Sequence, residues 1–358
     1  MGYTIVVILT PLQLKHYLYL CNQDKNLVPQ LIFFYKKNIS IEAFSNIEIL
    51  KNATIVGLDH KQILFNRIIK HKFKELKRIK KLLVSFKTQI DKSIPKNRQI
   101  NLVIGSEKDL FTQVLISAVY NQNQLKQLIA LEEGSAYYRR MTAKDFIFKF
   151  LYKLLTPVII GFKYHYFSTL GSHTLINKSY VRFPDLIPNK SDKIDYLKLE
   201  IPVELADLNK IKKSRKILFL TAPFSEKGKN SIQRDVDIVK WVEAAARKFE
   251  YELYLKPHPR EKANKYEGVF SNGKIIEKHI AAESLKLDDF HAIIHFGSSL
   301  IFNLKQIKYP FKKVITFNNL LGSLNLDDAL KDSIIVDLNC TQKDINHSFK
   351  KLMENQII

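Results

Sequence analysis

Three short polar clusters in the sequence carry side chains that can do chemistry. The first is Glu132-Glu133-Gly134, where two adjacent carboxylates follow an apolar run and a glycine allows a tight turn. Crowding and partial burial can raise the pKa of one carboxyl in such a pair, so either glutamate is a candidate acid or base. The alternative is a polar turn with glutamate at a helix start, which the helix dipole favours.

The second and third clusters are cationic and hydroxylic. In Lys256-Pro257-His258-Pro259-Arg260, two prolines restrict the backbone around one imidazole, and two cations flank it. This combination suits a phosphate or another anion. Gly297-Ser298-Ser299 precedes the helical stretch Leu300–Gln306, where hydroxyls and backbone N–H groups form an anion site. Ordinary serine capping is the alternative for this third cluster.

Metal and cofactor sites are not expected. Asp235-Val236-Asp237 matches a D-x-D pattern but opens a predicted helix, where acids are favoured for the dipole. Cys21 and Cys340 are too far apart in sequence to indicate a cysteine-based zinc site. His291 and His295 flank an apolar run and could converge on the site, but core or structural roles are expected of them. The sequence contains no G-x-x-x-x-G-K-[ST], G-x-G-x-x-G or H-E-x-x-H motif.

The elements that position these clusters alternate between apolar runs and helix-periodic stretches, a pattern typical of parallel βαβ units. Each cluster follows a predicted strand, and ligands of open parallel sheets bind beyond the carboxyl ends of the strands. Strands are expected at Ile5–Leu9, Leu31–Tyr35, Thr54–Leu58, Asn101–Gly105, Leu128–Leu131, Lys216–Leu220, Tyr251–Leu255, Ala292–His295, Val314–Phe317 and Ile334–Leu338. Helices are expected at Leu12–Cys21, Lys108–Asn121, Asp235–Phe249 and Gln342–Glu354.

The alternating pattern occurs twice. It stops in the polar stretch Ser191–Arg215, which we expect to cross between domains, and restarts at Lys216. The sequence therefore predicts an α/β fold made of two Rossmann-like domains, residues 1–190 and 191–358.

Composition limits the class of protein. With 46% hydrophobic residues and 11 Gly and 11 Pro in 358 residues, the chain is neither disordered nor collagenous. Two cysteines suit a reducing compartment. No apolar run is long enough to span a membrane, and Met1–Gln13 lacks the basic start of a signal peptide. A cytoplasmic protein is expected.

The charge is strongly positive, with 57 Lys+Arg against 35 Asp+Glu and a net charge of +22. Such a balance indicates a nucleic acid, an anionic lipid or an acidic substrate as partner. The basic residues concentrate in 61–98, where Leu64–Phe86 has the periodicity of an amphipathic helix with a basic outer face. That face either contacts lipid or polyanion, or is simply solvated.

Read together and in this order, the three clusters resemble the motifs of bacterial sialyltransferases. Those families carry an acidic D/E-D/E-G motif, an H-P motif and a later Ser-Ser or Ser-Thr motif. Thr10-Pro11-Leu12-Gln13 looks most like glycosyltransferase family 52, the lipooligosaccharide sialyltransferases. Leu131–Ser135 and Lys256–Glu261 are also similar to the family 38 capsular polysialyltransferases.

The resemblance implies a GT-B fold with a cleft between the domains and an inverting, metal-independent transfer from CMP-sialic acid. The N-terminal domain would face the acceptor and supply the base, and the C-terminal domain would hold the donor. Glu133 or Glu132 would be the base, and His258 would assist the departure of CMP. The resemblance also implies donor contacts from Lys256, Pro259, Arg260, Gly297, Ser298 and Ser299, and candidate substrate contacts from Thr10, Gln13 and Gly134.

Alternatives remain open for the acceptor and for the partners. The acceptor would be a cell-surface glycan, either lipooligosaccharide or capsule, and a polysialyltransferase that elongates polysialic acid is the first alternative. Another GT-B enzyme that moves Kdo or a phosphopolyol is more distant. The hypothesis of a nucleic-acid-binding protein is suggested by charge alone, and the sequence has no recognisable nucleic-acid-binding motif. No nucleic acid partner is therefore expected. Asp145–Phe162 is either a peripheral helix on the inner membrane or a buried helix, and the family 52 resemblance allows a homodimer.

Overall fold

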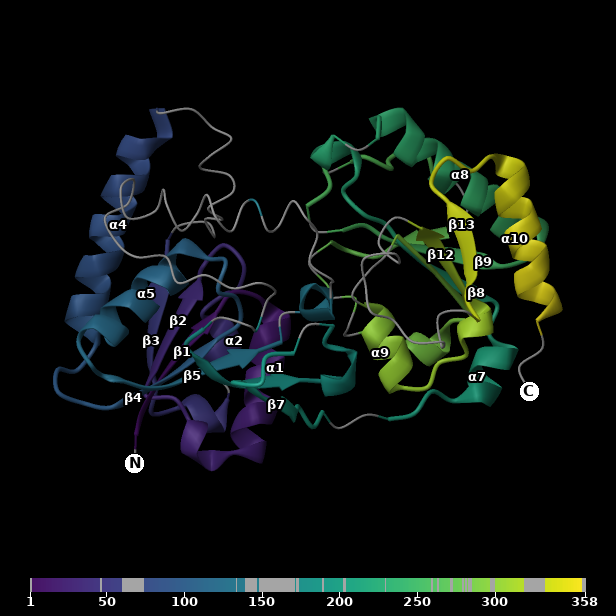
Figure 1. The fold of residues 1–358 in the computed structure, drawn as a ribbon. Helices are drawn as coiled ribbons and strands as arrows, with labels where there is room; N and C mark the ends of the chain where they lie inside the picture. Colours follow the sequence, from purple (N-terminus) through teal and green to yellow (C-terminus); the bar gives the residue numbers. More distant parts are fainter. Residues whose placement is uncertain are drawn as a thin grey trace. The chain divides into compact units, whose positions relative to one another are not determined.

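The computed structural model describes residues 2–45, 47–59, 74–132, 134–138, 147, 171, 174–188, 190–201, 204–228, 230–258, 260–262, 264–270, 273–278, 280, 282, 285–296, 300–318 and 332–355. The chain divides into two compact units, Met1–Ile201 and Pro202–Ile358. Each unit is built on its own parallel sheet (Figure 1).

The described strands of the first unit form a seven-stranded sheet in the order β3-β2-β1-β4-β5-β6-β7. All the neighbouring strands run parallel. The first six follow the 3-2-1-4-5-6 order of a Rossmann sheet. Their bounds are Tyr3–Ile8 (β1), Leu31–Tyr35 (β2), Thr54–Leu58 (β3), Ile100–Ile104 (β4), Leu125–Leu131 (β5), Ile176–Val181 (β6) and Asp195–Lys198 (β7).

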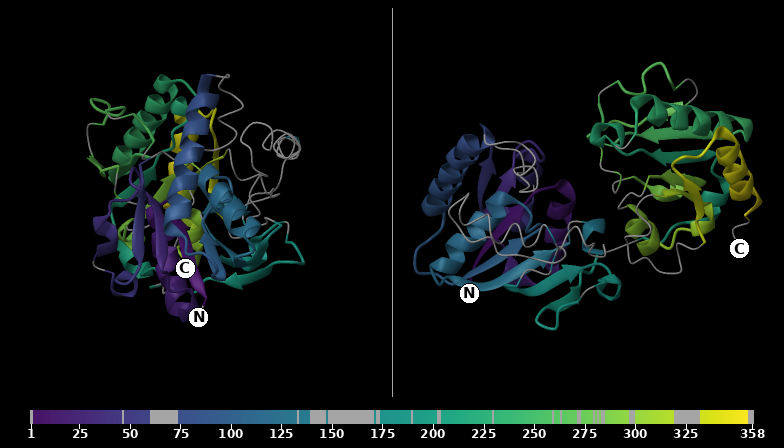
Figure 2. Two further views of the ribbon diagram at one scale, coloured as in Figure 1. Left: turned by 90° about the vertical axis from the view of Figure 1, so that its left-hand side faces the viewer. Right: turned by 45° about the horizontal axis from the view of Figure 1, so that its top comes forward.

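Helices cover both faces of this sheet, because successive side chains of a strand point to opposite faces. On β2, Phe34 packs against Phe44 of α2 (Glu42–Ser45) and lies in the same core cluster as the apolar face of α1 (Pro11–Gln23). The neighbouring Phe33 packs at 5.0 Å against Phe111 of α5 (Leu110–Asn121). Phe86 of α4 (Lys74–Ser93) contacts the same ring, which places α4 beside α5 (Figures 1 and 2).

The described strands of the second unit form a six-stranded parallel sheet in the order β10-β9-β8-β11-β12-β13, which repeats the Rossmann order. On β8, Ile217 and Phe219 face α8 and α10, and Leu218 and Leu220 face α7 and α9. The bounds are Lys216–Leu220 (β8), Glu252–Lys256 (β9), Gly273–Ile275 (β10), Ala292–His295 (β11), Val314–Asn318 (β12), Ile334–Asp337 (β13), Leu208–Lys213 (α7), Ile232–Lys248 (α8), Leu300–Gln306 (α9) and Gln342–Glu354 (α10).

The structure confirms the α/β class and the ten predicted strands, with ends that shift by up to three residues. Three further strands, β6, β7 and β10, were not predicted. The stretch expected to cross between domains, Ser191–Arg215, contains β7 and α7, and β7 pairs with β6 in the first sheet. The amino-terminal part of the predicted basic helix, 64–73, lies outside the described residues, and so does the predicted helix at 145–162 apart from residue 147. No helix in the described part of the chain is long and apolar enough to span a membrane.

Candidate active site

Glu132, the first residue after β5, lies in a buried ion pair. Its Oε1 accepts a hydrogen bond from Nε of Arg182 at 2.7 Å and lies 2.6 Å from a terminal guanidinium nitrogen of the same side chain. Its Oε2 accepts from the Tyr138 hydroxyl at 2.5 Å and from the Arg182 backbone N–H at 2.7 Å. A carboxylate offers about four lone-pair positions, and these contacts engage both of its oxygens.

Neutral groups surround this pair. Burial lowers the pKa of His16 to about 4, so its ring is uncharged near neutral pH. Nδ1 of His16 then donates to the Glu132 carbonyl oxygen at 3.1 Å, which links α1 to the end of β5. Burial, followed by the charge of Glu132, raises the pKa of Tyr138, so its hydroxyl stays a donor. Together these bonds fix α1, β5 and β6 at the carboxyl edge of the sheet.

The turn after Glu132 requires a glycine. Gly134 has φ of 125°, which L side chains rarely adopt. The chain then enters a short 3-10 turn, Ser135–Tyr138, in which the Tyr137 hydroxyl donates to the Leu131 carbonyl at 2.9 Å. Glu133, a predicted base, lies outside the described residues, but the residues on both of its sides are held by these contacts.

Thr10 and Gln13 lie at the carboxyl end of β1. The Thr10 hydroxyl caps α1 by accepting from the Gln13 N–H at 3.3 Å. The Gln13 side chain is buried, and its Oε1 accepts from the Leu9 N–H at 2.6 Å. Both residues, predicted as substrate contacts, therefore bond to the local backbone, and the prediction that they touch substrate remains untested.

His258 follows β9 in a half-buried position. Its ring Nδ1 accepts a hydrogen bond from the backbone N–H of Arg260 at 3.0 Å. The backbone N–H of His258 donates to Oε2 of Glu261 at 2.7 Å. Because Nδ1 is an acceptor here, a neutral ring carries its proton on Nε2. The local backbone therefore sets the tautomer of this imidazole.

The two cations of the H-P cluster differ in position. Lys256 is 3% exposed, and its ammonium donates to the carbonyls of Pro257 at 2.9 Å and Lys278 at 3.1 Å. Arg260 is exposed. Lys256 therefore secures the loop from inside, whereas the Arg260 side chain reaches solvent. Pro259 lies outside the described residues.

The third cluster, Gly297-Ser298-Ser299, also lies outside the described residues. Its flanks are placed as predicted: β11 precedes it, and α9 begins at Leu300. Before it, His295 is fully buried, with its Nε2 at 3.1 Å from Oγ1 of Thr316. His291 donates from Nδ1 to the Ile211 carbonyl at 3.1 Å. Both histidines therefore have the core roles expected of them.

The sequence did not indicate the residues that bond to these motifs and hold them in place. Arg182 is fifty residues from Glu132 in the chain, and no local signal pairs the two. Glu261 was quoted within the H-P motif without a role, although it receives the His258 N–H. Asp235 was assigned only to a helix start, yet it also bonds Lys265 at 2.7 Å. In the described residues no group of three or more His, Cys, Asp or Glu side chains is arranged to hold a metal ion.

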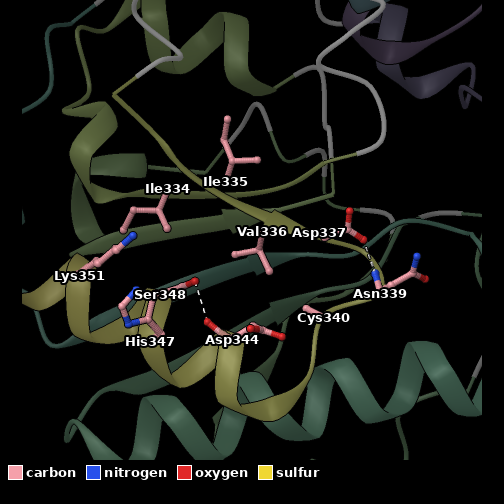
Figure 3. Close-up of a pocket in the computed structure, with 10 residues that line it drawn as sticks. All are labelled: Ile334, Ile335, Val336, Asp337, Asn339, Cys340, Asp344, His347, Ser348 and Lys351. Carbon is pink, nitrogen blue, oxygen red and sulfur yellow. Dashed lines mark hydrogen bonds between the residues drawn. The ribbon is translucent and has the colours of Figure 1, made fainter.

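A separate cavity of about 350 Å³ lies between the edge strand β13 and α10 (Figure 3). Its side chains bond mainly to their own neighbourhood. Asp337 accepts from the Asn339 N–H at 2.7 Å, and the Ser348 hydroxyl donates to the Asp344 carbonyl at 2.8 Å. None of the predicted site residues that the structure describes lines this cavity.

Solved structures resemble the chain over nearly its whole length. The glycosyltransferase of kitacinnamycin has a TM-score of 0.57 at 10% identity, covering 99% of this chain and 92% of that chain. A putative UDP-N-acetylglucosamine 2-epimerase from Listeria monocytogenes has a TM-score of 0.56 at 9% identity, covering 99% and 89%. The UDP-GlcNAc 2-epimerase of Methanocaldococcus jannaschii, in complex with UDP-GlcNAc and UDP, has a TM-score of 0.53 at 13% identity. The match covers 99% of this chain and 94% of that chain.

At these identities the likeness establishes the fold, which is GT-B, and not the reaction. No curated protein sequence matches the chain. A family profile does: the one described as Alpha-2,8-polysialyltransferase (POLYST) matches residues 4–317, which include all three motifs and parts of both units. The chain therefore belongs to the α2,8-polysialyltransferase family and is a sialyltransferase enzyme.

Proposed function

We propose that the enzyme elongates a sialic acid polymer. It would move sialic acid from CMP-sialic acid to the 8-hydroxyl of the acceptor's terminal residue, inverting the anomeric centre without a metal or other cofactor. The observation that carries this proposal is the family match over residues 4–317. The strand-end placement of the Glu132 and His258 motifs supports it, since ligands of parallel sheets bind at that edge.

Glu133 is the proposed base. Glu132 is a poor candidate because it is fully buried and both of its oxygens are engaged by Arg182 and Tyr138, whereas a base needs an oxygen within reach of the hydroxyl. In the proposed step the acceptor oxygen bonds to the anomeric carbon and passes its proton to Glu133. The bond from that carbon to the phosphate oxygen breaks with its electron pair, and CMP leaves.

His258 would assist the departure of CMP. With Nδ1 accepting from Arg260, the protonated Nε2 is the nitrogen that donates to a phosphate oxygen. Exposed Arg260 adds positive charge beside it, and Ser298 and Ser299 would hold the same phosphate through their hydroxyls. Such interactions act most strongly on the charge that develops in the transition state.

An anionic acceptor fits the net charge of +22. A polymer of sialic acid fits better than a neutral lipooligosaccharide terminus. The Thr10 and Gln13 motif, on which the family 52 resemblance rests, is accounted for by the capping of α1 and the bond to Leu9.

We further propose a cytoplasmic location with contact to the inner membrane surface through exposed Lys80, Lys81, Lys87 and Lys92 of α4. The homodimer remains a prediction.

The test is CMP release from CMP-sialic acid in EDTA, with an oligosialic acceptor, a lactose-terminated acceptor or none. We expect release only with the oligosialic acceptor, together with longer chains on anion exchange. Preference for the lactose-terminated acceptor would instead indicate a single-transfer enzyme, and loss of activity in EDTA would contradict metal independence.

The base is tested by a matched pair of variants. We expect Glu133→Gln to lower kcat by about 10²–10⁴-fold with an unchanged melting temperature. Glu132→Gln should lower the melting temperature because it removes one partner of a buried ion pair. Near-full activity of Glu133→Gln would contradict the assignment.

A further inference from the structure

A buried lysine in the second unit is surrounded by three carboxylates. Nζ of Lys265 lies 2.7 Å from Oδ2 of Asp235, 3.0 Å from Oε1 of Glu261 and 3.2 Å from Oε2 of Glu226. The Lys265 side chain is 1% exposed. We call these four residues the lysine hub. None of them has a role in the proposed transfer step.

The hub joins the loops that follow two adjacent strands. Glu226 and Asp235 come from the segment between β8 and the first turn of α8, and Glu261 and Lys265 come from the loop after β9. A backbone group reinforces the link, since the Lys262 N–H donates to Glu226 at 3.0 Å. Within the first segment, the Ser225 N–H donates to Asp235 at 3.0 Å. The two strand-end loops are therefore held to each other.

Glu261 connects the hub to His258. Its Oε1 accepts from Lys265 and from the Tyr266 hydroxyl at 2.7 Å. Its Oε2 accepts from the Thr221 hydroxyl and from the His258 N–H at 2.7 Å. In return, the Glu261 N–H donates to the His258 carbonyl at 3.0 Å. Both backbone polar groups of His258 are thus bonded to one residue.

Lys265 keeps its positive charge near neutral pH. Burial opposes the charge of Lys265, but its hydrogen bond to Asp235 and the charge of Glu261 outweigh burial and raise its pKa. Burial, followed by the charge of Glu261, raises the pKa of Tyr266, which remains a donor. A charged Lys265 and a protonated Tyr266 therefore stay available to orient the Glu261 carboxylate.

We propose that Glu261 is a positioning residue of the transferase reaction, oriented by Lys265 and Tyr266 so that it fixes the backbone of His258 and the direction of its imidazole. The hydrogen bond from the Arg260 N–H to Nδ1 of His258 belongs to the same arrangement, because Arg260 lies between His258 and Glu261 in the chain. The inference rests on the proposed role of His258 in the departure of CMP. A ring held this way presents its protonated Nε2 in one direction, and small errors of position are costly in catalysis.

The first experiment is a double-mutant cycle on kcat. We expect Glu261→Gln to lower kcat by about 10²-fold with little change in KM, because the ring is misplaced while substrate still binds. If Glu261 acts through His258, Glu261→Gln should add no further loss in a His258→Ala background. Losses that multiply would overturn the proposal, since Glu261 would then act independently of His258.

Milder variants guard against misfolding. Tyr266→Phe removes one donor to Glu261 without changing charge, and we expect a smaller fall in kcat, about threefold to tenfold, at an unchanged fold. Glu243→Gln alters another buried carboxylate of the same unit and should leave kcat unchanged. Equal losses of kcat in Glu243→Gln and Glu261→Gln would show general destabilisation and contradict the positioning role.

A spectroscopic readout separates this inference from the proposed function. In ¹⁵N-histidine-labelled protein we expect the ring shifts of His258 to report an unprotonated Nδ1 and a protonated Nε2. Glu261→Gln should convert them to a mixture of tautomers. A wild-type tautomer in Glu261→Gln overturns the inference. If His258→Ala is fully active, the role of His258 in transfer fails, yet the shifts still show whether Glu261 orients the ring.

Discussion

At the scale of single residues, the contacts of Glu132 commit it to a structural role. Glu132 is fully buried and bonded to Arg182 and Tyr138, so its charge is committed to holding β6 and the 3-10 turn against β5. Removing one partner of a buried pair leaves the other charge uncompensated in a medium of low polarity. The pair therefore fixes the residue that directly precedes Glu133 in the chain.

This reasoning predicts a large loss of stability in Arg182→Met. Because the Glu132 carboxylate would remain buried without its cation, we expect the free energy of unfolding to fall by about 3–5 kcal/mol in urea titrations at neutral pH. The control is Lys36→Met, which removes an exposed ion pair with Asp59 and should change stability by less than about 1 kcal/mol. Equal effects of the two variants would contradict the structural role of Arg182.

The sequence marked these residues as candidates but could not choose between them. Adjacent carboxylates after an apolar run marked Glu132 and Glu133 together, and only the contacts of Glu132 distinguish them. The tautomer of His258 likewise depends on an N–H two residues away, which a residue type cannot reveal. Contacts between residues distant in the chain, such as Glu132 with Arg182, leave no local pattern.

At the scale of elements, the carboxyl ends of β1 and β4 meet with little space between them. A Cβ atom added to Gly105 would lie 2.2 Å from Nε2 of Gln13. The Gln13 side chain has no simple way to move aside, because it is buried and bonded to the Leu9 N–H. Gly105 thus permits the close approach of α1 to the end of β4.

We therefore expect Gly105→Ala to lower the free energy of unfolding by about 1–3 kcal/mol through overpacking. In a Gln13→Ala background the obstructing side chain is gone, and the same substitution should change stability by less than about 0.5 kcal/mol. Chemical denaturation of the four proteins in the cycle measures this coupling. Additive losses would show that Gly105 and Gln13 do not interact.

Elements with clear apolar runs were predicted well, and polar ones were not. The buried runs of β2 and β8 had the bounds that their sequences indicated. The missed strands are short or polar: β6 contains Asn, Lys and Ser, β7 spans four residues, and all of β10 is exposed. Of these, β7 and β10 are edge strands, which pair on one side alone, whereas β6 lies inside its sheet and was missed because polar residues interrupt its apolar pattern.

At the scale of the whole molecule, the restart of the alternating pattern near Lys216 predicted two Rossmann-like halves. The units divide at Ile201 and Pro202, inside the polar stretch expected to link them. The GT-B likeness and the family match agree with that architecture. Composition could not reveal which titratable groups are buried in the two halves, because burial is a property of the folded chain.

Three buried histidines give the folded protein a predictable dependence on acid. Burial is the main cause that lowers the pKa of His16, His291 and His295 to about 4 from the usual 6.5. Between about pH 6.5 and 4 these histidines bind protons in the unfolded chain but not in the folded chain. The free energy of unfolding therefore has its full value above about pH 6.5 and falls as the pH decreases toward 4. Each group contributes on the order of 3 kcal/mol over that window.

We expect the free energy of unfolding, measured in urea between pH 7 and 5, to decrease with a slope that approaches about 4 kcal/mol per pH unit, as three protons require. Replacing one of these groups by an uncharged side chain, as in His295→Gln, should lower the limiting slope by about 1.4 kcal/mol per pH unit, whatever the variant does to stability at pH 7. The window lies above the range in which most carboxylates titrate, so histidines dominate the slope. A stability that stays flat from pH 7 to 5 would mean that these rings accept protons in the folded state, in which case His291 would have to part from the Lys313 ammonium at its Nε2.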